Sequence, residues 1–243
     1  MTPTLCIMGG CNGAGKTTLA RELLPRLGLM RFLNADEIAR GLSPLDPTLS
    51  AFKAGRLVIE EARTMIAAGT SFALESTLSG KTYAAMLRAA KERGYHIVLH
   101  YVMIASAAQA VQRVRLRVRM GGHDVPPDDV ARRYERSLRH FISDYLPLAD
   151  EWGVWENTSP PPRKIAGNKT HSIKDLIDLL NATNLMESNP PQPDPMSAMV
   201  LEAGRVATEK MLDYYKRMGI KVTPQMTLAP EPKKRVRKAK TGS

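Results

Sequence analysis

A glycine-rich loop near the start of this sequence constrains the fold more than any other feature. The residues Gly10-Cys11-Asn12-Gly13-Ala14-Gly15-Lys16-Thr17 match the pattern G-x-x-x-x-G-K-[ST] and directly follow an apolar run over 4–8 that predicts a strand. In such a loop the glycines let backbone N–H groups converge on a phosphate, and the helix that follows adds the partial positive charge of its N-terminus. The motif therefore predicts a phosphate-binding loop between the first strand and the first helix of an α/β fold.

The fixed positions of this loop predict a nucleoside triphosphate and a metal ion as ligands. Lys16 is expected to reach the β- and γ-phosphates, Thr17 to coordinate Mg²⁺ through its hydroxyl, and Thr18 to hydrogen-bond the phosphate nearest the nucleoside. We therefore expect ATP as the phosphoryl donor and Mg²⁺ as the cofactor. The residues expected to bind ATP are Gly10, Asn12, Gly13, Ala14, Gly15, Lys16, Thr17 and Thr18.

Cys11 inside the loop allows two interpretations. A helix N-terminus lowers the pKa of a thiol, which would make Cys11 an oxidisable group beside the phosphates. The alternative, which we favour, is that any small residue suits a position whose backbone does the binding. Cys6 and Cys11 are the only two cysteines and are too close together for a useful disulfide, which is consistent with a reducing compartment.

Apolar runs alternate with segments of helical period from residue 4 to about residue 181. This alternation is typical of βα units and a mainly parallel sheet. We predict the three-layer α/β fold of a P-loop kinase with a mainly parallel sheet, followed by a C-terminal helical appendage. The predicted strands are 4–8, 30–33, 70–74, 95–104 and 152–156, and the predicted helices are 16–24, 48–68, 81–93, 106–119, 128–145 and 172–180.

The composition shifts after this predicted domain, residues 1–181. Residues 182–195 contain four prolines and predict a linker, 196–222 show an apolar stripe that predicts an amphipathic helix, and 223–243 predict a disordered basic tail. The appendage could be a solvated segment, a built-in restraint that docks on the core, or a contact for another chain or for nucleic acid. Six Lys and Arg residues between 233 and 240 account for much of the formal net charge of +11, so charge alone does not identify a nucleic-acid-binding protein.

The start of the chain and its hydropathy bear on its location. The sequence has no apolar run near the roughly 20 residues that span a bilayer, and its start has no signal-like pattern. We therefore expect a soluble, cytoplasmic protein without membrane contact.

Further residues supply the parts that a phosphotransferase needs. Asp36 follows the second predicted strand and could accept a proton from an acceptor hydroxyl, and arginines late in the fold could neutralise charge on the triphosphate. Two other classes of P-loop protein lack support. The strand over 97–104 runs into Ala105-Ser106 rather than the Asp-Glu pair of a motor or ring ATPase, and Leu78-Ser79-Gly80 lacks the Gly-Gln that continues a transporter-ATPase signature.

Four segments carry a resemblance to a known family. They are Gly10 to Thr18, Asn34-Ala35-Asp36-Glu37-Ile38-Ala39, Glu75-Ser76-Thr77-Leu78-Ser79-Gly80, and Gly121-Gly122-His123-Asp124-Val125-Pro126 with Arg132-Arg133-Tyr134. Together they strongly resemble the zeta toxin family, over about residues 1–181. That family comprises P-loop kinases of bacterial toxin–antitoxin modules, whose best-known activity is ATP-dependent phosphorylation of the sugar 3′-hydroxyl of UDP-N-acetylglucosamine. This sequence is similar to the shorter, chromosomal branch.

The resemblance implies roles for individual residues and a partner. Thr17 becomes the metal ligand, Asp36 the base that prepares the acceptor hydroxyl, and Glu75 and Thr77 contacts of the acceptor sugar. An antitoxin protein that covers the ATP pocket is the implied partner. The residues with an implied catalytic role, including the candidates for a γ-phosphate clamp, are Asp36, Lys16, Arg113, Arg117 and Arg133.

Ordinary structural roles compete with these assignments. Asp36 could be the N-cap of a helix that begins at Glu37, Glu75 a solvated charge at a strand end, and His123 a turn residue. The arginines could form a solvated helix face.

The leading hypothesis is a small-molecule kinase that acts on UDP-N-acetylglucosamine or a related metabolite. The same parts would serve a kinase that acts on an antibiotic, a nucleotide cofactor or an RNA 5′-end. A nucleotide-dependent switch or a nucleic-acid-binding ATPase is the alternative from a different class.

Overall fold

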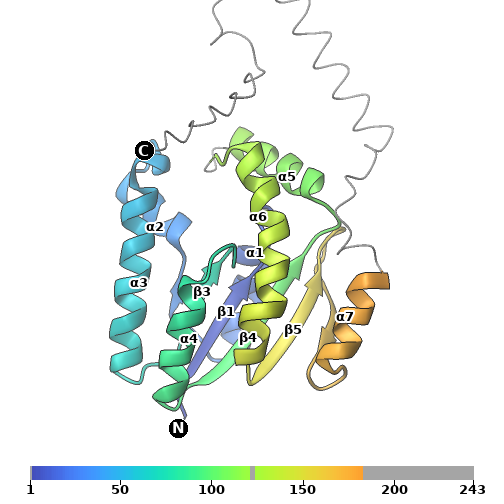
Figure 1. Ribbon diagram of the computed structural model, residues 1–243. Coiled ribbons are helices and arrows are strands. Elements are labelled where there is room, and N and C mark those ends of the chain that lie inside the picture. Colours follow the sequence, from blue (N-terminus) through green and yellow to red (C-terminus); the bar gives the residue numbers. More distant parts are fainter. Residues whose placement is uncertain (1, 121–123, 183–243) are drawn as a thin grey trace, which may run out of the picture. The chain divides into compact units, whose positions relative to one another are not determined.

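The computed structural model describes residues 2–120 and 124–182, which form a six-stranded sheet with helices on both faces (Figure 1). The strand order is β2-β3-β1-β4-β5-β6, and every neighbouring pair is parallel except β5 and β6. This arrangement confirms the predicted α/β fold with a mainly parallel sheet. The strands are β1 (Thr4–Gly9), β2 (Phe32–Leu33), β3 (Phe72–Ser76), β4 (His96–Met103), β5 (Glu151–Glu156) and β6 (Arg163–Gly167).

Helices connect the parallel strands and cover the sheet from two sides. Buried residues of α1 and α5 pack against one face, and those of α3, α4 and α7 pack against the other. A 3₁₀ turn, η1 (Pro47–Ser50), precedes α3, and α6 continues into a π turn, η2 (Phe141–Tyr145), and a 3₁₀ turn, η3 (Leu146–Leu148). The α-helices are α1 (Lys16–Arg26), α2 (Ala35–Leu42), α3 (Ala51–Ala67), α4 (Thr82–Glu92), α5 (Ala107–Arg119), α6 (Pro127–His140) and α7 (Ile173–Ala182).

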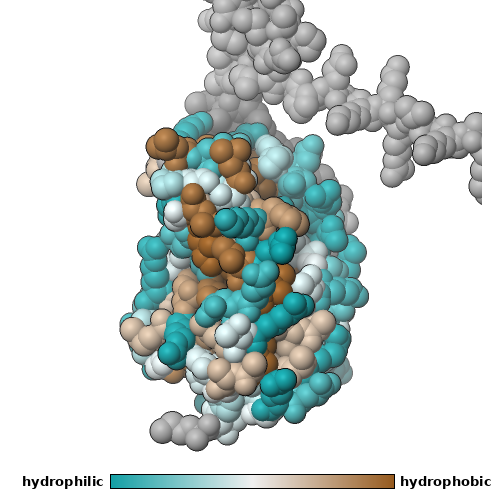
Figure 2. All heavy atoms as spheres, turned by 90° about the vertical axis from the view of Figure 1, so that its left-hand side faces the viewer, coloured by the Kyte–Doolittle hydropathy of each residue, from teal (hydrophilic) through white to brown (hydrophobic). Residues whose placement is uncertain are grey.

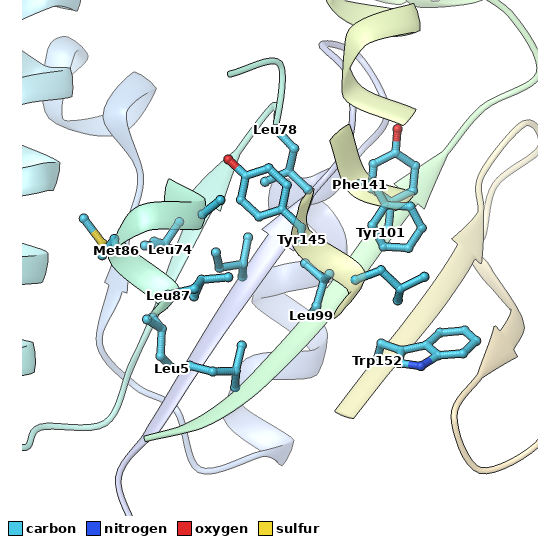
Figure 3. Packing of buried hydrophobic residues seen from close by; sticks show 14 of the residues in the cluster. Leu5, Leu74, Leu78, Met86, Leu87, Leu99, Tyr101, Phe141, Tyr145 and Trp152 are labelled. Atoms are coloured by element: carbon cyan, nitrogen blue, oxygen red, sulfur yellow. The ribbon is translucent and has the colours of Figure 1, made fainter. Parts of the chain in front are cut away.

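The central strands are apolar throughout because both faces of the sheet are covered. Alternate side chains of a strand point to opposite faces, so Leu5 and Ile7 of β1 enter one hydrophobic cluster and Cys6 and Met8 enter the other. All four are fully buried. Figure 3 shows the first cluster, where side chains from the strands meet those of α4 and η2.

Two elements are absent from the predicted strands and helices, although a helix from Glu37 was raised as an alternative explanation of Asp36. Each element depends on contacts that hydropathy does not record. The short helix α2 begins after Asn34, whose side chain accepts hydrogen bonds from the backbone N–H groups of Asp36 and Glu37. Asn34 is therefore the N-cap, and the interpretation of Asp36 as the N-cap is wrong. The edge strand β6 pairs antiparallel with β5 through a register shift between Val154 and Trp155.

Several predictions fall on residues that the structure does not describe. These are the turn at Gly121, Gly122 and His123, and residues 183–243, which include most of the predicted linker together with the predicted amphipathic helix and basic tail. Among the described helices, none combines the length and the apolar character that a membrane span requires.

Candidate active site

The carboxyl ends of the parallel strands form the edge of the sheet where the predicted site residues meet. β1 ends at Gly9, the loop turns over 10–15, and α1 begins at Lys16. Gly10 and Gly15 have φ angles of 139° and 90°, and a Cβ atom on Gly10 would lie 2.2 Å from the carbonyl oxygen of Val102. Only glycine fits this position without a shift of the backbone. The loop thus has the turn geometry that the motif predicts.

One carboxylate ties the first turn of α1 to the end of β3. Glu75 Oε2 accepts a hydrogen bond from Thr17 Oγ1 at 2.7 Å, and Glu75 Oε1 lies 3.5 Å from Lys16 Nζ. Lys16 Nζ also donates to the backbone oxygen of Cys11 at 2.9 Å. The Lys16 and Glu75 side chains are only 7% and 12% exposed, so solvent ions screen their interaction little. The ammonium and hydroxyl groups that the motif assigns to phosphate and metal are therefore held by protein contacts.

Asn34 connects this cluster to α2. Its Nδ2 donates to Glu75 Oε2 at 2.9 Å, and its Oδ1 accepts from the backbone N–H of Asp36 at 2.9 Å. A single amide side chain thereby fixes the first turn of α2, and with it Asp36, relative to Glu75. Asn34 was not predicted as a site residue, although an asparagine just before a helix is a recognised capping signal.

The three arginines predicted to clamp the triphosphate have different surroundings. Arg117 Nη1 of α5 lies 3.7 Å from Asp36 Oδ2, and the two side chains are 36% and 46% exposed. Arg113, one turn earlier, donates to the backbone oxygen of Thr158 at 3.0 Å and contacts that of Gly13 at 3.5 Å. Arg133 of α6 lies 4.0 Å from Asp129 of the same helix. The structure therefore brings Arg117 to the candidate base and Arg113 to the phosphate-binding loop.

Thr77 lies in a tightly held turn after β3. Its Oγ1 is 2.9 Å from Ser79 Oγ, and the residue between them, Leu78, has a φ angle of 53° with a fully buried side chain. The hydroxyl of Tyr145 in η2 donates to the backbone oxygen of Gly80 at 2.6 Å. A left-handed backbone is unfavourable for leucine and persists where surrounding contacts fix it. These contacts hold Thr77 at the same edge of the sheet as the loop.

Cys11 is buried within the loop. Its residue surface is 2% exposed, and burial raises the pKa of its thiol to about 11 against the opposing influence of Lys16. A raised pKa disfavours the thiolate, which is the reactive form. The interpretation of Cys11 as an oxidisable thiol of lowered pKa is therefore wrong, and a small residue that the loop accommodates is the better description.

The donor atoms of the site fit a magnesium ion that is bound together with a nucleotide. The Thr17 hydroxyl and the Glu75 carboxylate are hard oxygen donors, and they lie in direct contact. Within residues 2–120 and 124–182, no group of three or more His, Cys, Asp or Glu side chains could hold a metal by itself. Since Mg²⁺ commonly uses one or two protein oxygens and completes its shell with phosphate oxygens and water, these residues suit it.

A third region, directly after β5, contacts the loop from another side. Asn157 Nδ2 donates to the backbone oxygen of Ala14 at 2.8 Å, and Gln109 Nε2 donates to that of Thr158 at 3.0 Å. Neither asparagine nor glutamine was predicted here. Their position past the carboxyl end of a parallel strand, and at the start of the helix that faces it, is the only sequence signal that could have found them.

Comparison with protein families and relatives agrees with this geometry. Residues 5–141 match the model of an AAA domain, AAA_33, which is more than half of the chain and includes every predicted site residue. An uncharacterized protein from Haemophilus influenzae is 34% identical over 125 residues, a match that covers 51% of this chain and 88% of the relative.

Solved structures share the fold at low sequence identity. One from the PezAT chromosomal toxin–antitoxin system of Streptococcus pneumoniae is 16% identical, with a TM-score of 0.55 over 87% of this chain and 88% of the other. A candidate kinase from Chloroflexus aurantiacus is 21% identical, with a TM-score of 0.51 over 75% and 99% of the two chains. The complex of AvrRxo1-ORF1 and -ORF2 with ATP gives 17%, a TM-score of 0.58, and coverage of 79% and 67%. These likenesses confirm the predicted α/β fold, which the chain shares with proteins from a toxin–antitoxin system and with a candidate kinase.

Proposed function

The chain belongs to the AAA-domain family, and on that premise we propose that it is an ATP-dependent kinase that phosphorylates a hydroxyl group of a small molecule. The observation that carries the proposal is the chain of contacts that begins at Lys16 and Thr17, passes through Glu75 and Asn34, and reaches the turn that bears Asp36. It joins the groups that hold a phosphoryl donor to a candidate base for the acceptor.

On the donor side, the loop N–H groups and Lys16 bind the β- and γ-phosphates, and Thr17 holds the metal. Bound Mg²⁺ would supply positive charge that offsets the charge of the phosphates. The hydrogen bond from Thr17 to Glu75 fixes the direction of the threonine hydroxyl, and the nearby Lys16 balances the carboxylate charge. These contacts support a donor-side role for Glu75, in place of the acceptor contact that the family resemblance implies.

On the acceptor side, Asp36 accepts the proton of the attacking hydroxyl as the oxygen approaches the γ-phosphate. Arg117 lies beside this carboxylate. Of the three arginines it is the best placed to stabilise the negative charge that develops as the phosphoryl group moves from the donor to the acceptor. Thr77 contacts the acceptor sugar from its turn after β3. Arg113 and Arg133 remain candidates for the triphosphate clamp, Arg113 through its contact with the loop.

The acceptor that we propose is UDP-N-acetylglucosamine or a related metabolite, on the strength of the motifs shared with the zeta toxin family. We also propose a protein partner of antitoxin type. Two of the similar structures come from a toxin–antitoxin system and from a two-protein complex, which supports a partner for this chain.

The function is tested by incubating the purified protein with ATP, Mg²⁺ and UDP-N-acetylglucosamine, and in parallel with a bacterial metabolite extract, followed by mass spectrometry. We expect one new species that is heavier by a phosphoryl group, and ADP in equal amount. Asp36→Asn serves as the matched control because it should bind ATP but form no product.

Each outcome of this experiment has a definite meaning. A product from the extract but not from UDP-N-acetylglucosamine would replace the acceptor and keep the kinase. ATP hydrolysis without any phosphorylated acceptor, unchanged in Asp36→Asn, would contradict the kinase and favour a nucleotide-dependent switch.

A further inference from the structure

The segment that follows β5 reaches across to the phosphate-binding loop. The backbone N–H of Asn157 donates to the oxygen of Met103 at 2.9 Å, which continues the pairing of β5 with β4 by one residue. The Thr158 N–H donates to Glu156 Oε1 at 2.6 Å. The backbone of Asn157 is therefore held by β4, and that of Thr158 by the side chain of Glu156 at the end of β5. These hydrogen bonds fix the segment relative to the sheet.

The side chain of Asn157 spans from this segment to the loop. Its Nδ2 donates to the backbone oxygen of Ala14 at 2.8 Å, and a Cβ atom on Gly15 would come within 2.3 Å of the same nitrogen. Ala14 and Gly15 are the two residues just before Lys16, where the loop N–H groups turn towards the phosphates. The glycine at 15 thus leaves room for the amide as well as allowing a left-handed backbone.

The oxygen of the Asn157 amide has a different environment from the nitrogen. Asn157 is 6% exposed, and its Oδ1 is buried without a hydrogen-bond partner among the described residues. An unsatisfied buried acceptor is unfavourable, so an asparagine chosen for stability alone is a poor solution at this site. The hydrogen bond from Asn157 Nδ2 to the loop therefore explains why an amide side chain occupies this position.

The neighbouring carbonyl holds a second part of the site. The backbone oxygen of Thr158 accepts hydrogen bonds from Arg113 Nη2 and Gln109 Nε2, both at 3.0 Å, and Arg113 also contacts the loop at Gly13. The segment after β5 therefore makes two contacts with the site: Asn157 binds the loop, and the carbonyl of Thr158 binds Arg113 of α5.

We propose that Asn157 is a positioning residue that sets the phosphate-binding loop of this protein for ATP. Its hydrogen bond to the Ala14 oxygen fixes the orientation of the peptide group between Ala14 and Gly15. That orientation helps the N–H groups of the loop to converge on the phosphates. The inference rests on the proposed function only in requiring that the loop binds ATP. Phosphoryl transfer to an acceptor is not needed to test it.

The test measures the dissociation constant of a fluorescent ATP analogue with Mg²⁺ for wild type and Asn157→Asp between pH 8 and pH 5.5. An ionised carboxylate has the shape of the amide but cannot donate to Ala14. We expect binding to weaken about tenfold or more at pH 8 and to recover towards wild type at pH 5.5, where the buried carboxyl regains a proton that it can donate. A residue with a merely structural role would not couple ATP affinity to pH in this way.

Two further variants separate the lost donor from the added charge and from general destabilisation. Asn157→Leu is neutral and lacks a donor, so its ATP affinity should fall about three- to tenfold at both pH values; it also serves if Asn157→Asp does not fold. Asn168→Asp is the matched control, since Asn168 Nδ2 donates to the backbone oxygen of Asp150 at 3.1 Å, in the turn that precedes β5. It should lower the thermal midpoint without changing ATP affinity.

The possible results distinguish the positioning role of Asn157 from the proposed kinase activity. Wild-type affinity in Asn157→Leu, or an equal loss of affinity in Asn168→Asp, would overturn the positioning role while the kinase stands. A wild-type protein that binds no ATP would overturn both.

Discussion

The two halves of the candidate site are built differently. On the donor half, the Lys16 and Glu75 side chains are 7% and 12% exposed and contact each other. Lys16 also contacts the backbone of Cys11, and Glu75 also accepts hydrogen bonds from Thr17 and Asn34. On the acceptor half, Asp36 and Arg117 are 46% and 36% exposed and meet at 3.7 Å. A buried, mutually bonded cluster keeps its geometry, whereas half-exposed side chains adjust to what binds. The difference indicates that the fold sets the donor half, and we expect a bound acceptor to order the other half.

Exposed apolar side chains lie close in sequence to the acceptor half. Leu45 and Leu49, before and within η1, and Phe52 at the start of α3 are 103%, 80% and 81% exposed. They follow directly after α2, the helix that carries Asp36. Figure 2 turns the side of the molecule that bears α2 and α3 to the viewer, and apolar side chains form a band there among charged ones.

The largest effect is expected from removing the charge on the donor half. Lys16→Ala should lower kcat/KM by about a thousandfold, because it removes the cation that faces the β- and γ-phosphates. The measurement is the rate of ADP formation with an acceptor. Lys53→Ala, at an exposed position of α3, is the control and should retain activity. Activity in Lys16→Ala near that of the control would contradict the assignment of the loop.

On the acceptor half, Asp36→Asn should separate chemistry from donor binding. We expect kcat to fall by about a hundredfold or more because the proton acceptor is lost, while the affinity for ATP stays within about twofold. ATP affinity is measured by fluorescence titration and kcat by product mass spectrometry. Asp46→Asn is the matched control, because it removes the charge of a carboxylate outside the site while the asparagine oxygen can still accept the hydrogen bond from the Thr48 N–H that caps η1. A parallel loss of ATP affinity in Asp36→Asn would mean that the two halves are not independent.

A smaller effect is expected where the halves join. Glu75→Gln keeps the shape of the side chain but removes the charge beside Lys16 and weakens its hydrogen bonds with Thr17 and Asn34. If Glu75 orients the metal-binding hydroxyl, the Mg²⁺ concentration for half-maximal activity should rise about ten- to a hundredfold. Titration of activity with Mg²⁺ at saturating ATP measures this. A raised KM for the acceptor with an unchanged Mg²⁺ requirement would return Glu75 to the acceptor role that the family resemblance implies.

The same contrast separates what could be predicted from the sequence from what could not. The loop carries its chemistry in consecutive residues, so the motif placed Lys16 and Thr17 correctly at the start of α1. Asn34 and Asn157 act on partners 41 and 143 residues away, and no local pattern records such contacts. Long periodic elements such as β4 and α5 were predicted to within about two residues. The short strand β6 was missed, and the short helix α2 was raised only as an alternative with the wrong N-cap, because a strand pairing and a side-chain cap, not periodicity, define them.

The smallest effect at neutral pH is expected away from both halves, at His100 of β4. His100 is 8% exposed, and burial, aided by the charge of Lys164, lowers the pKa of its imidazole from 6.5 to about 4. Its Nδ1 faces Trp155 Nε1 at 3.4 Å and can accept that hydrogen bond only when it carries no proton. His100 should therefore be neutral in the folded protein at pH 7.

This depressed pKa predicts a loss of stability in acid. Below pH 6.5 the unfolded chain binds a proton that the folded protein does not, so the free energy of unfolding should fall between about pH 6.5 and pH 4, by about 3 kcal/mol from this group. Urea unfolding of wild type and His100→Gln across that range measures it, with His171→Gln, at a partly exposed position, as the control. The slope should flatten in His100→Gln alone. The result also sharpens the comparison of the two halves, because a decline in activity below pH 6 reports on the site only after this loss of folded protein has been subtracted. An equal slope in all three proteins would show that folding does not lower the pKa of His100, and would assign the acid response to other titratable groups.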